Sequence, residues 1–445
     1  MSRFLLSLLC MGCSPTVPSV LIKGEVDTGG STGSDGGSDG SSDGADGSTD
    51  GADGGTDGSD GAGYVEDGEV ETVPGMEDDD ELLFDESRIP EFYITLSDAS
   101  IAVLESEGQW DDHQYVEAML TFEGVTYGPI GLRMKGENSW RPFNRKSSLK
   151  MDFNRYEEGP DRFYGLKGLT FQAMNEDYSM MHERVAYRVY RELGVPAVRA
   201  HHAVLYVNGE LYGLFTMLDS VNDQFLERNF TDPSGSMWEQ HDGDYVDGDV
   251  TNPDLFQHEE GEDNRAPLQA VADALENSGP EALAAAGEHL DWTAFHRYWA
   301  AGGLVMNFDA YPFRFRGDDC HVYHDPERGK LVYIPHGVDE SFYSDADFQN
   351  VAAGIYVGGH LSARCLQVEQ CRDDWANIVY DGLEIMEALD IAAYAEEVRD
   401  QIDPWVNIEP DAAYTRREIS AYQLSMIDLI QNRRASVDYY LGGRP

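Results

Sequence analysis

The sequence predicts an α+β fold: a strand-rich first half, then a mainly helical second half, with a disordered acidic tether in front. Two patterns support this order. Apolar and polar residues alternate with a period of two between Glu91 and Phe153, as in half-buried strands. From Trp375 to Leu441 the pattern is that of amphipathic helices. The chain beyond the tether, roughly 360 residues, is long enough for one large two-lobed domain or two ordinary ones.

The composition is strongly acidic. The 445-residue chain has 83 acidic and 31 basic side chains and a formal net charge of -52. Such a charge repels nucleic acid and anionic lipid, and no apolar run approaches the ~20 residues of a membrane span. We therefore expect no nucleic-acid partner and a membrane contact only through a lipid anchor. Divalent cations and basic protein substrates are favoured.

The N-terminus indicates export. Residues 1–13 combine a basic residue, a short apolar core and Gly12 before Cys13, which resembles a bacterial lipoprotein signal peptide with an acylated cysteine. A cryptic or mis-started N-terminus is the alternative, because Cys10 stands where leucine is usual. Residues 14–88 are predicted to be a disordered tether, since their Gly-, Ser- and Asp-rich part lacks the apolar residues that offset the entropy of ordering.

Basic residues gather on the predicted sheet. In residues 147–153 the apolar side chains alternate, so Lys150 faces the opposite side. Four basic positions surround the polar loop 136–139: Arg133, Lys135, Lys146 and Lys150. Such a cluster suits an anion such as triphosphate. Salt bridges to neighbouring carboxylates are the alternative.

A helix is predicted over about 179–193, with the stop signal Gly194 and Pro196 behind it. Glu183 lies near its apolar stripe, where it could pair with a sheet lysine; a solvated Glu is the alternative. A hairpin follows across Asn208-Gly209, the strongest short hairpin signal in the chain.

The second half begins with an acidic stretch, 232–263, that is predicted to be a loop or insertion, followed by predicted helices over 266–286 and 292–306. Further along, Cys365 and Cys371 are six positions apart, a spacing that permits a small disulfide loop in an oxidising compartment.

The central stretch, 304–342, carries three acidic points: Asp309, Asp319 with its neighbour Asp318, and Asp339. Two predicted strands between them form a hairpin that carries Asp309 and Asp339 towards the same end. Converging carboxylates repel unless a cation lies between them, and magnesium is the usual one. The pattern suits ATP-dependent phosphoryl transfer. An acidic hairpin loop on a very acidic protein is the alternative.

Together these stretches resemble the CotH family, the spore-coat-protein-H type of atypical protein kinases. The resemblance extends from about Ile89 to Leu441, with the family's motifs in order. Five segments carry it, namely the Arg/Lys–Gly–Ser signature, the helix, the Asn-Gly hairpin, the Asn–Asp–Tyr motif and the terminal Asp motif: 132–153, 179–197, 204–226, 307–311 and 321–342.

The resemblance implies a kinase-like fold with a β-rich N-lobe (89–230) and a helical C-lobe (231–445). It also implies the use of ATP with Mg²⁺ or Mn²⁺, and serine phosphorylation of secreted or surface proteins, which the acidity suggests are basic and Ser-rich. Asp309 takes the place of the catalytic Asp, and Asp339, with Asp319, that of the metal ligands. The residues that the resemblance places at the nucleotide-binding site are Arg133, Lys146, Lys150 and Glu183.

Some positions depart from the family pattern. Gly337 replaces the first Asp of its D-x-D motif, and Asp219 and Asn222 replace the Glu and Asp of E-x-I-D. These departures leave two alternatives open: a catalytically impaired kinase-like surface or adhesion protein, and an ATP-dependent transferase of another group.

Overall fold

A closed barrel occupies the first half of the described chain. The computed structural model describes residues 80–136, 139–246, 248–307, 309–313, 317–342 and 357–445. The barrel strands follow the spatial order β1-β2-β3-β4-β5-β7-β6, closed by a parallel pairing of β1 with β6. Their bounds are β1 (Glu91–Leu96), β2 (Val116–Phe122), β3 (Val125–Lys135), β4 (Ser148–Asp152), β5 (Gly168–Gln172), β6 (Ala200–Val207) and β7 (Glu210–Asp219).

The alternation in the sequence explains why these strands close around a core. Leu132 and Met134 on β3, and Leu149 and Met151 on β4, are fully buried inside the barrel. The residues between them face outwards, as the period-two pattern predicts. Between β6 and β7, Asn208 (φ 49°) and Gly209 (φ 86°) adopt the left-handed conformations that a tight hairpin turn needs. The predicted strands and hairpin are confirmed.

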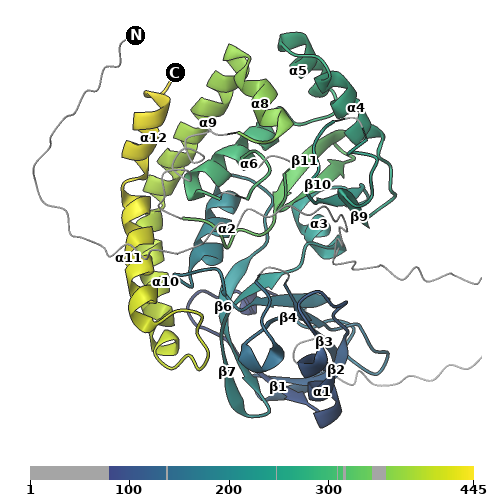
Figure 1. The fold of residues 1–445 in the computed structure, drawn as a ribbon, viewed down its shortest axis with the longest axis vertical. Helices are drawn as coiled ribbons and strands as arrows, with labels where there is room; N and C mark the ends of the chain where they lie inside the picture. Colours follow the sequence, from purple (N-terminus) through teal and green to yellow (C-terminus); the bar gives the residue numbers. More distant parts are fainter. Residues whose placement is uncertain (1–79, 137–138, 247, 308, 314–316, 343–356) are drawn as a thin grey trace, which may run out of the picture. The chain divides into compact units, whose positions relative to one another are not determined.

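Helices and a second sheet surround a separate core (Figure 1). This sheet has the order β11-β10-β8-β9, with β8 (Met237–Gln240), β9 (Phe256–Glu260), β10 (Cys320–Asp325) and β11 (Lys330–Pro335). The two cores meet at β6 and β7, where Leu205 and Phe215 point into the barrel while Val204 and Leu214 point into the second core. All described residues belong to one compact unit.

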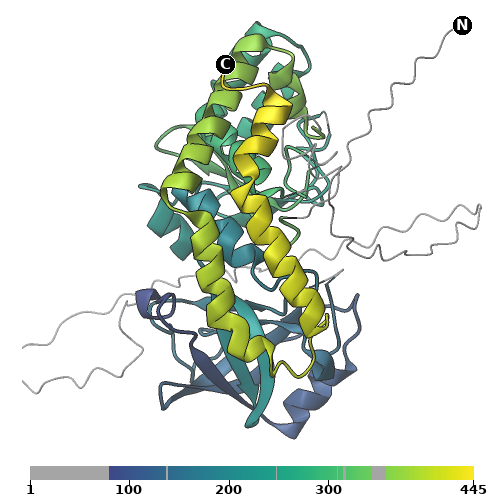
Figure 2. The same cartoon turned by 90° about the vertical axis from the view of Figure 1, so that its left-hand side faces the viewer.

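Helix α2 (His182–Glu192) packs on the second core through the predicted apolar face, so the predicted helix is confirmed. The other helices are α1 (Asp98–Ser106), α3 (Asp223–Asn229), α4 (Ala266–Leu275), α5 (Pro280–Ala286), α6 (Trp292–Val305), α8 (His360–Leu366), α9 (Glu369–Ala388), α10 (Ile391–Val406), α11 (Arg416–Gln431) and α12 (Arg433–Leu441). In Figure 2, α10 and α11 run side by side, and α10 ends and α11 begins beside the barrel.

One local prediction was wrong. Residues 232–263, predicted to be a loop or insertion, are not merely a loop, because they contain strands β8 and β9. Met237, Trp238 and Phe256 are fully buried there, and β8 pairs with β10. A partner strand from a distant segment supplies the stability that the acidic local sequence does not signal.

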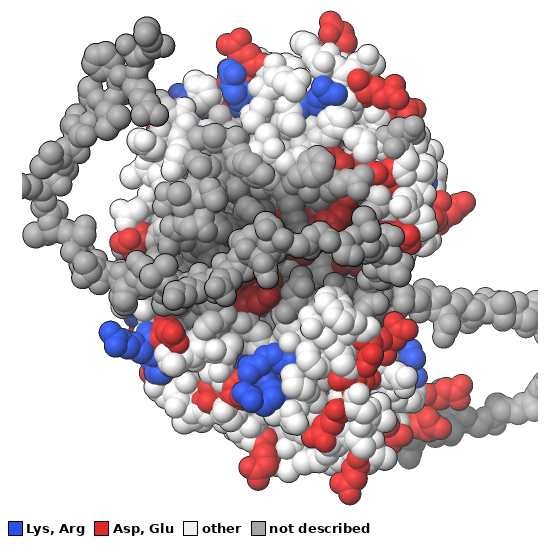
Figure 3. Space-filling view, viewed as in Figure 1, with Lys and Arg blue, Asp and Glu red and all other residues white. Residues whose placement is uncertain are grey.

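The α+β class is confirmed. The predicted signal peptide (1–13) with Cys13, and the tether except its last residues, lie outside the described residues. Among the described residues, no helix is both long and apolar enough to cross a bilayer. Acidic side chains are spread over the face drawn in Figure 3, whereas basic side chains occur there in a few places.

Candidate active site

The outer face of β3 and β4 carries three basic side chains. Arg133 lies opposite Lys150, and Lys135 lies opposite Ser148, in the antiparallel register. Directly opposed residues, and residues two apart on a strand, share a face. Arg133, Lys135 and Lys150 therefore all point away from the barrel core, and each is half-buried.

Helix α2 presents a carboxylate to this face. Glu183, in its first turn, is 1% exposed, and neither of its oxygens accepts a hydrogen bond from a described residue. The Thr216 hydroxyl interacts with it without reaching hydrogen-bond geometry. Burial raises the pKa of Glu183 well above its ordinary value, the charge of Asp339 adds to the rise, and Lys135 opposes it. Burial lowers the pKa of Lys135, and Glu183 is the main charge that opposes this shift.

The loop after β11 is tied to the start of α2. The Asp177 carboxylate accepts a hydrogen bond from the backbone N–H of His182 at 2.7 Å. The ring Nδ1 of His182 lies 2.7 Å from the carbonyl oxygen of Asp339 and donates to it. Burial raises the pKa of Asp339, with Asp177 adding to the rise and Lys135 and His182 opposing it. These contacts bring Asp339 within electrostatic reach of Glu183 and Lys135.

Further carboxylates gather around Asp339. Burial and the charge of Asp309, which is also hydrogen-bonded to Glu340, raise the pKa of Glu340 to about 8. After burial, Asp339 and Asp309 are the causes that raise the pKa of Glu176. We call the set of interacting carboxylates the acid cluster: Glu176, Glu183, Asp309, Asp339 and Glu340.

The acid cluster has the donor chemistry of a divalent-cation site. Asp339 raises the pKa of Glu176, Glu183 and Glu340, because like charges repel strongly when they are poorly solvated. Mg²⁺ and Mn²⁺ prefer oxygen ligands, and the two oxygens of Glu183 lack hydrogen-bond donors among the described residues. The oxygen donor set suits such an ion, but among the described residues no three of these carboxylates bring ligand atoms within 4.8 Å of one another.

Asp319 approaches the same loop from the start of β10. A Cβ atom placed on Gly337 would lie 2.4 Å from Asp319 Oδ1. The Asp319 carboxylate thus fills the space beside Gly337, which adopts a left-handed conformation (φ 53°). Glycine at position 337 leaves room for an acidic side chain supplied by another strand.

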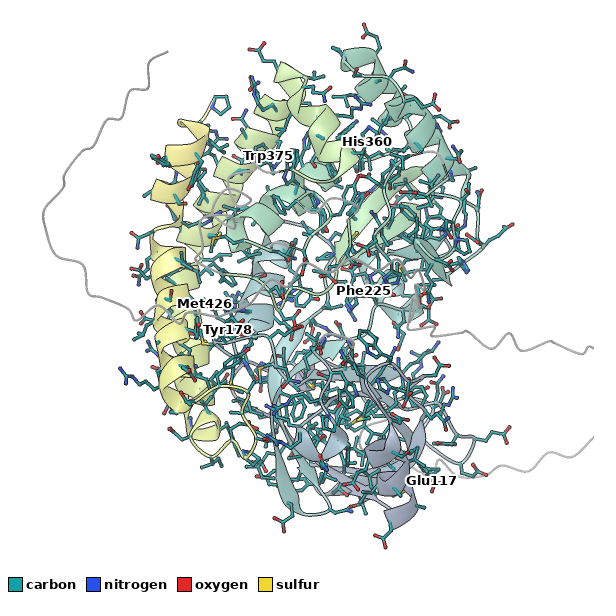
Figure 4. The ribbon with its side chains drawn as sticks, in the orientation of Figure 1. Glu117, Tyr178, Phe225, His360, Trp375 and Met426 are labelled. Carbon is teal, nitrogen blue, oxygen red and sulfur yellow. A yellow bond between two sulfur atoms is a disulfide. The ribbon has the colours of Figure 1, made fainter. Side chains whose placement is uncertain are left out.

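A polar hollow adjoins the acid cluster. It has a volume of about 450 Å³ and shares Glu176 with the cluster. Its other walls come from the loop after β3, through Trp140 and Arg141, and from Tyr178 and Tyr414. Figure 4 labels Tyr178 where the chain leads into α2. The hollow is wide and polar enough to admit a charged ligand or a peptide segment next to the carboxylates.

Lys146 does not join the other predicted basic residues. It is 2% exposed and forms an ion pair with Glu409, with Nζ 3.3 Å from Oε1, and its ammonium lies 4.9 Å from the centre of the Phe215 ring. The backbone at Lys146 is left-handed (φ 60°) and precedes β4, so the residue does not follow that strand's alternation. Its charge is matched by the segment between α10 and α11.

Several residues of this site were not singled out from the sequence. Lys135 belonged to the predicted basic cluster without a specific role, although its spacing of two from Arg133 placed both on one face. Glu340 directly follows Asp339 and could have been found by that adjacency. Asp177 and Glu176 precede α2, and no local pattern indicates that they face a loop more than 150 residues away.

The structure joins Cys365 and Cys371 through a disulfide, with Cα atoms 5.3 Å apart. Cys320 is a buried free thiol, and burial raises its pKa well above the ordinary value.

Comparison with known proteins identifies the family. A family model described as CotH kinase protein matches residues 132–437. The inner spore coat protein H of Bacillus subtilis (strain 168) is 22% identical over 313 residues, which cover 65% of this chain and 81% of that protein.

Two solved structures are also similar. The Shewanella oneidensis MR-1 toxin–antitoxin complex of HipA, HipB and operator DNA contains a chain with 14% identity and a TM-score of 0.30, and the match covers 69% of this chain and 68% of that chain. The proinflammatory kinase CtkA of Helicobacter pylori has 10% identity and a TM-score of 0.27, with 73% and 91% covered. Since the family model spans more than half of the sequence, this chain belongs to the CotH kinase protein family.

Proposed function

We propose that this protein is a protein kinase that transfers the terminal phosphate of ATP to serine hydroxyls of exported proteins. In this proposal the fold is a two-lobed kinase-like one, with residues 89–230 as the N-lobe and 231–445 as the C-lobe. The observation that carries the proposal is the electrostatic coupling of Lys135, Glu183 and Asp339. Asp339 also acts on Glu176, which lines a polar hollow. Membership of the CotH kinase protein family supports it.

The basic face of β3 and β4 would hold the nucleotide. Bound ATP supplies the phosphoryl group, and Mg²⁺ or Mn²⁺ offsets its charge. Lys135 would donate hydrogen bonds to phosphate oxygens, with Glu183 fixing the position of its ammonium group. Arg133 and Lys150 would add positive charge on the same face. We assign to Lys135 the contact that the sequence suggested for Lys146, because Lys146 is paired with Glu409 elsewhere.

Carboxylates of the acid cluster, with Asp319, would bind the metal and activate the substrate hydroxyl. Asp339, with Asp319, would hold the metal. Asp309 would orient the serine hydroxyl of the substrate and accept its proton. Glu340, whose pKa is raised to about 8, would carry a proton at pH 7 and donate its hydrogen bond to Asp309, which would hold the Asp309 side chain in position.

The substrate side of the proposal rests on charge. Glu176 lines the hollow, and acidic side chains are spread over the face drawn in Figure 3. A basic, Ser-rich segment of a secreted or surface protein is complementary to both.

Two variants of the full-length chain separate metal binding from acceptor activation. Asp339→Asn removes a charged metal ligand, so ATP binding in the presence of Mn²⁺ should weaken together with transfer. Asp309→Asn should leave ATP binding near the wild-type affinity while transfer falls by roughly 10²–10⁴-fold, the usual contribution of a general base. Calorimetric titration of ATP with Mn²⁺ or Mg²⁺, and phosphate incorporation into a basic Ser-rich peptide, measure the two effects.

The exposed Asp112 provides the matched control, because Asp112→Asn makes the same chemical change far from the cluster and should alter neither quantity. If wild type shows no ATP binding at millimolar nucleotide with either metal, the kinase proposal is wrong.

A specific observation favours a second candidate, a catalytically impaired kinase-like surface or adhesion protein. Gly337 occupies a position where the family pattern has an acidic residue. That candidate predicts no metal-dependent nucleotide binding in wild type or in either variant. ATP binding with transfer of a group other than phosphate, detected by the mass added to the peptide, would instead support the transferase alternative.

We also propose that the protein is exported and anchored at the cell envelope through Cys13; its relative, an inner spore coat protein, is compatible with a surface location. Cys13→Ala should move the protein from the membrane fraction to the soluble fraction, because acylation of this cysteine supplies the anchor. Cys10→Ala is the matched control and should leave the protein membrane-bound. A wild-type chain that is soluble and retains Met1 would contradict the anchor.

A further inference from the structure

A histidine lies against the disulfide. His296 belongs to the first turns of α6, Cys365 to the last turn of α8 and Cys371 to the first turn of α9. The His296 Nε2 atom is 3.5 Å from the sulfur of Cys365 and 3.4 Å from that of Cys371. One ligand atom from each residue therefore lies within 4.8 Å of the other two. The group shares no residue with the acid cluster.

These distances match the edges of a tetrahedral metal centre. With Zn–N bonds of about 2.0–2.1 Å and Zn–S bonds of about 2.3 Å, tetrahedral angles put nitrogen and sulfur about 3.6 Å apart and two sulfurs about 3.8 Å apart. The nitrogen–sulfur separations are already close to the required value. Once the disulfide is reduced, only the two sulfurs would have to move apart, and with Cα atoms 5.3 Å apart rotation about the Cα–Cβ bonds would supply this separation.

The surroundings hold the group in place and limit its access to water. His296 is 4% exposed and Cys365 is fully buried, whereas Cys371 is half-buried. Trp299 of α6 stacks on Trp375 of α9 with ring centroids 4.3 Å apart, which fixes the two helices relative to each other. Figure 4 labels Trp375 on α9, one helical turn after Cys371. Three protein ligands with one partly open side are typical of a four-coordinate site that keeps one position for water or another ligand.

We propose that the dithiol form of the chain binds a zinc-like divalent metal through His296 Nε2 and the sulfurs of Cys365 and Cys371, and that the disulfide and the metal exclude each other. A newly synthesised chain carries the thiols. A folded, oxidised chain regains them when a dithiol reductant passes two electrons and two protons to the disulfide and itself becomes a disulfide. Binding of the metal then releases one proton from each cysteine thiol.

The test compares the reduced and oxidised forms of the full-length wild-type chain. The protein is reduced with a phosphine, freed of reductant without oxygen, and titrated with Co²⁺. The reduced form should bind one equivalent with the absorption of thiolate-to-cobalt charge transfer and of tetrahedral cobalt, and Zn²⁺ should displace it. The oxidised form should show neither absorption. This comparison needs no substitution, so a folding defect cannot imitate the result.

Variants then assign the ligands. Cys371→Ser should abolish the charge-transfer absorption, and His296→Gln should weaken Co²⁺ binding by at least about tenfold, since even loss of an outer-shell partner costs that much. Cys320→Ser is the matched control, a buried free thiol outside the group, and should change nothing. The proposal is overturned if reduced wild type shows no cobalt–thiolate absorption. It is also overturned if that absorption survives in Cys371→Ser, and its loss on replacement of Cys10 and Cys13 would then assign it to those cysteines.

Discussion

Buried carboxylates have different partners in two regions of the molecule, the acid cluster and the segment between α10 and α11. In that segment Glu409 pairs with Lys146 and also accepts a hydrogen bond from the backbone N–H of Leu214 at 2.7 Å. Asp411 accepts from Arg145 at 2.8 Å. We call these contacts the docking seam, because they hold the segment against the barrel. Each carboxylate of the seam has a basic partner.

In the acid cluster one lysine faces several carboxylates: Lys135 opposes the pKa rise of both Glu183 and Asp339. Glu183 is as deeply buried as Glu409, yet no described residue donates a hydrogen bond to it. Asp309 and Asp339 raise the pKa of neighbouring carboxyls. A fold under selection for stability alone would have no reason to keep such groups together. This difference in partners indicates two roles for buried carboxylates in this protein. Those paired with a basic side chain stabilise the fold, whereas those that gather near other carboxylates indicate a cation-binding site.

The largest effect is expected from breaking the seam. Lys146→Met leaves the buried carboxylate of Glu409 without its cation, which should lower the free energy of unfolding by about 3–5 kcal/mol. Urea denaturation followed by circular dichroism measures this change. In the double variant Lys146→Met, Glu409→Gln, the amide oxygen still accepts from Leu214 and no charge is stranded, so most of the loss should be recovered. A double variant no more stable than the single one would contradict the matched-pair interpretation.

The acid cluster should respond in the opposite direction. Glu183→Gln removes a poorly compensated buried charge, so without metal or nucleotide the variant should be about 1–3 kcal/mol more stable than wild type at pH 8. Phosphate transfer should fall by about 10²-fold, because Lys135 loses the group that positions it. Thermal unfolding and the transfer assay together distinguish this result from a general folding defect.

The same substitution has a pH signature. The folded chain holds the proton of Glu183 to a higher pH than the unfolded chain does. The unfolding free energy of wild type should therefore fall as pH rises above the ordinary glutamate pKa of 4.5. Glu183→Gln should show a flatter dependence over that range. If Glu183→Gln is less stable than wild type at pH 8, the Glu183 carboxylate stabilises the fold as Glu409 does, and our interpretation of the acid cluster is wrong.

The smallest effect is expected at the solvent-facing end of the seam. The Arg145 side chain is 59% exposed and that of Asp411 is 24% exposed, so water and salt screen the pair. Asp411→Asn should lower the unfolding free energy by about 0.2–1 kcal/mol, and the difference should shrink in 1 M salt, where the Debye length is about 3 Å. A salt-independent loss would mean that Asp411 acts through its buried contacts instead.

Local patterns sufficed for much of the fold. The barrel strands, α2 and the hairpin at Asn208-Gly209 follow from periodicity and turn residues that neighbouring positions determine. The segments that resemble the CotH family lie within residues 132–437, which the family model matches. The proposed roles of Asp309 and Asp339 were available from the same motifs.

Tertiary structure decided which residues meet. Lys146 and Lys135 look equivalent in the sequence. In the structure the backbone at Lys146 is left-handed and its side chain pairs with Glu409, so Lys146 belongs to the docking seam. Lys135 instead ends β3 opposite α2, where only the packing of the helix against the barrel brings Glu183 to it. Strands β8 and β9 likewise exist because β10 pairs with β8. Periodicity and turn residues reflect contacts between positions a few residues apart. The partner of a charged side chain comes from a segment far away in the sequence, and only folding brings the two segments together.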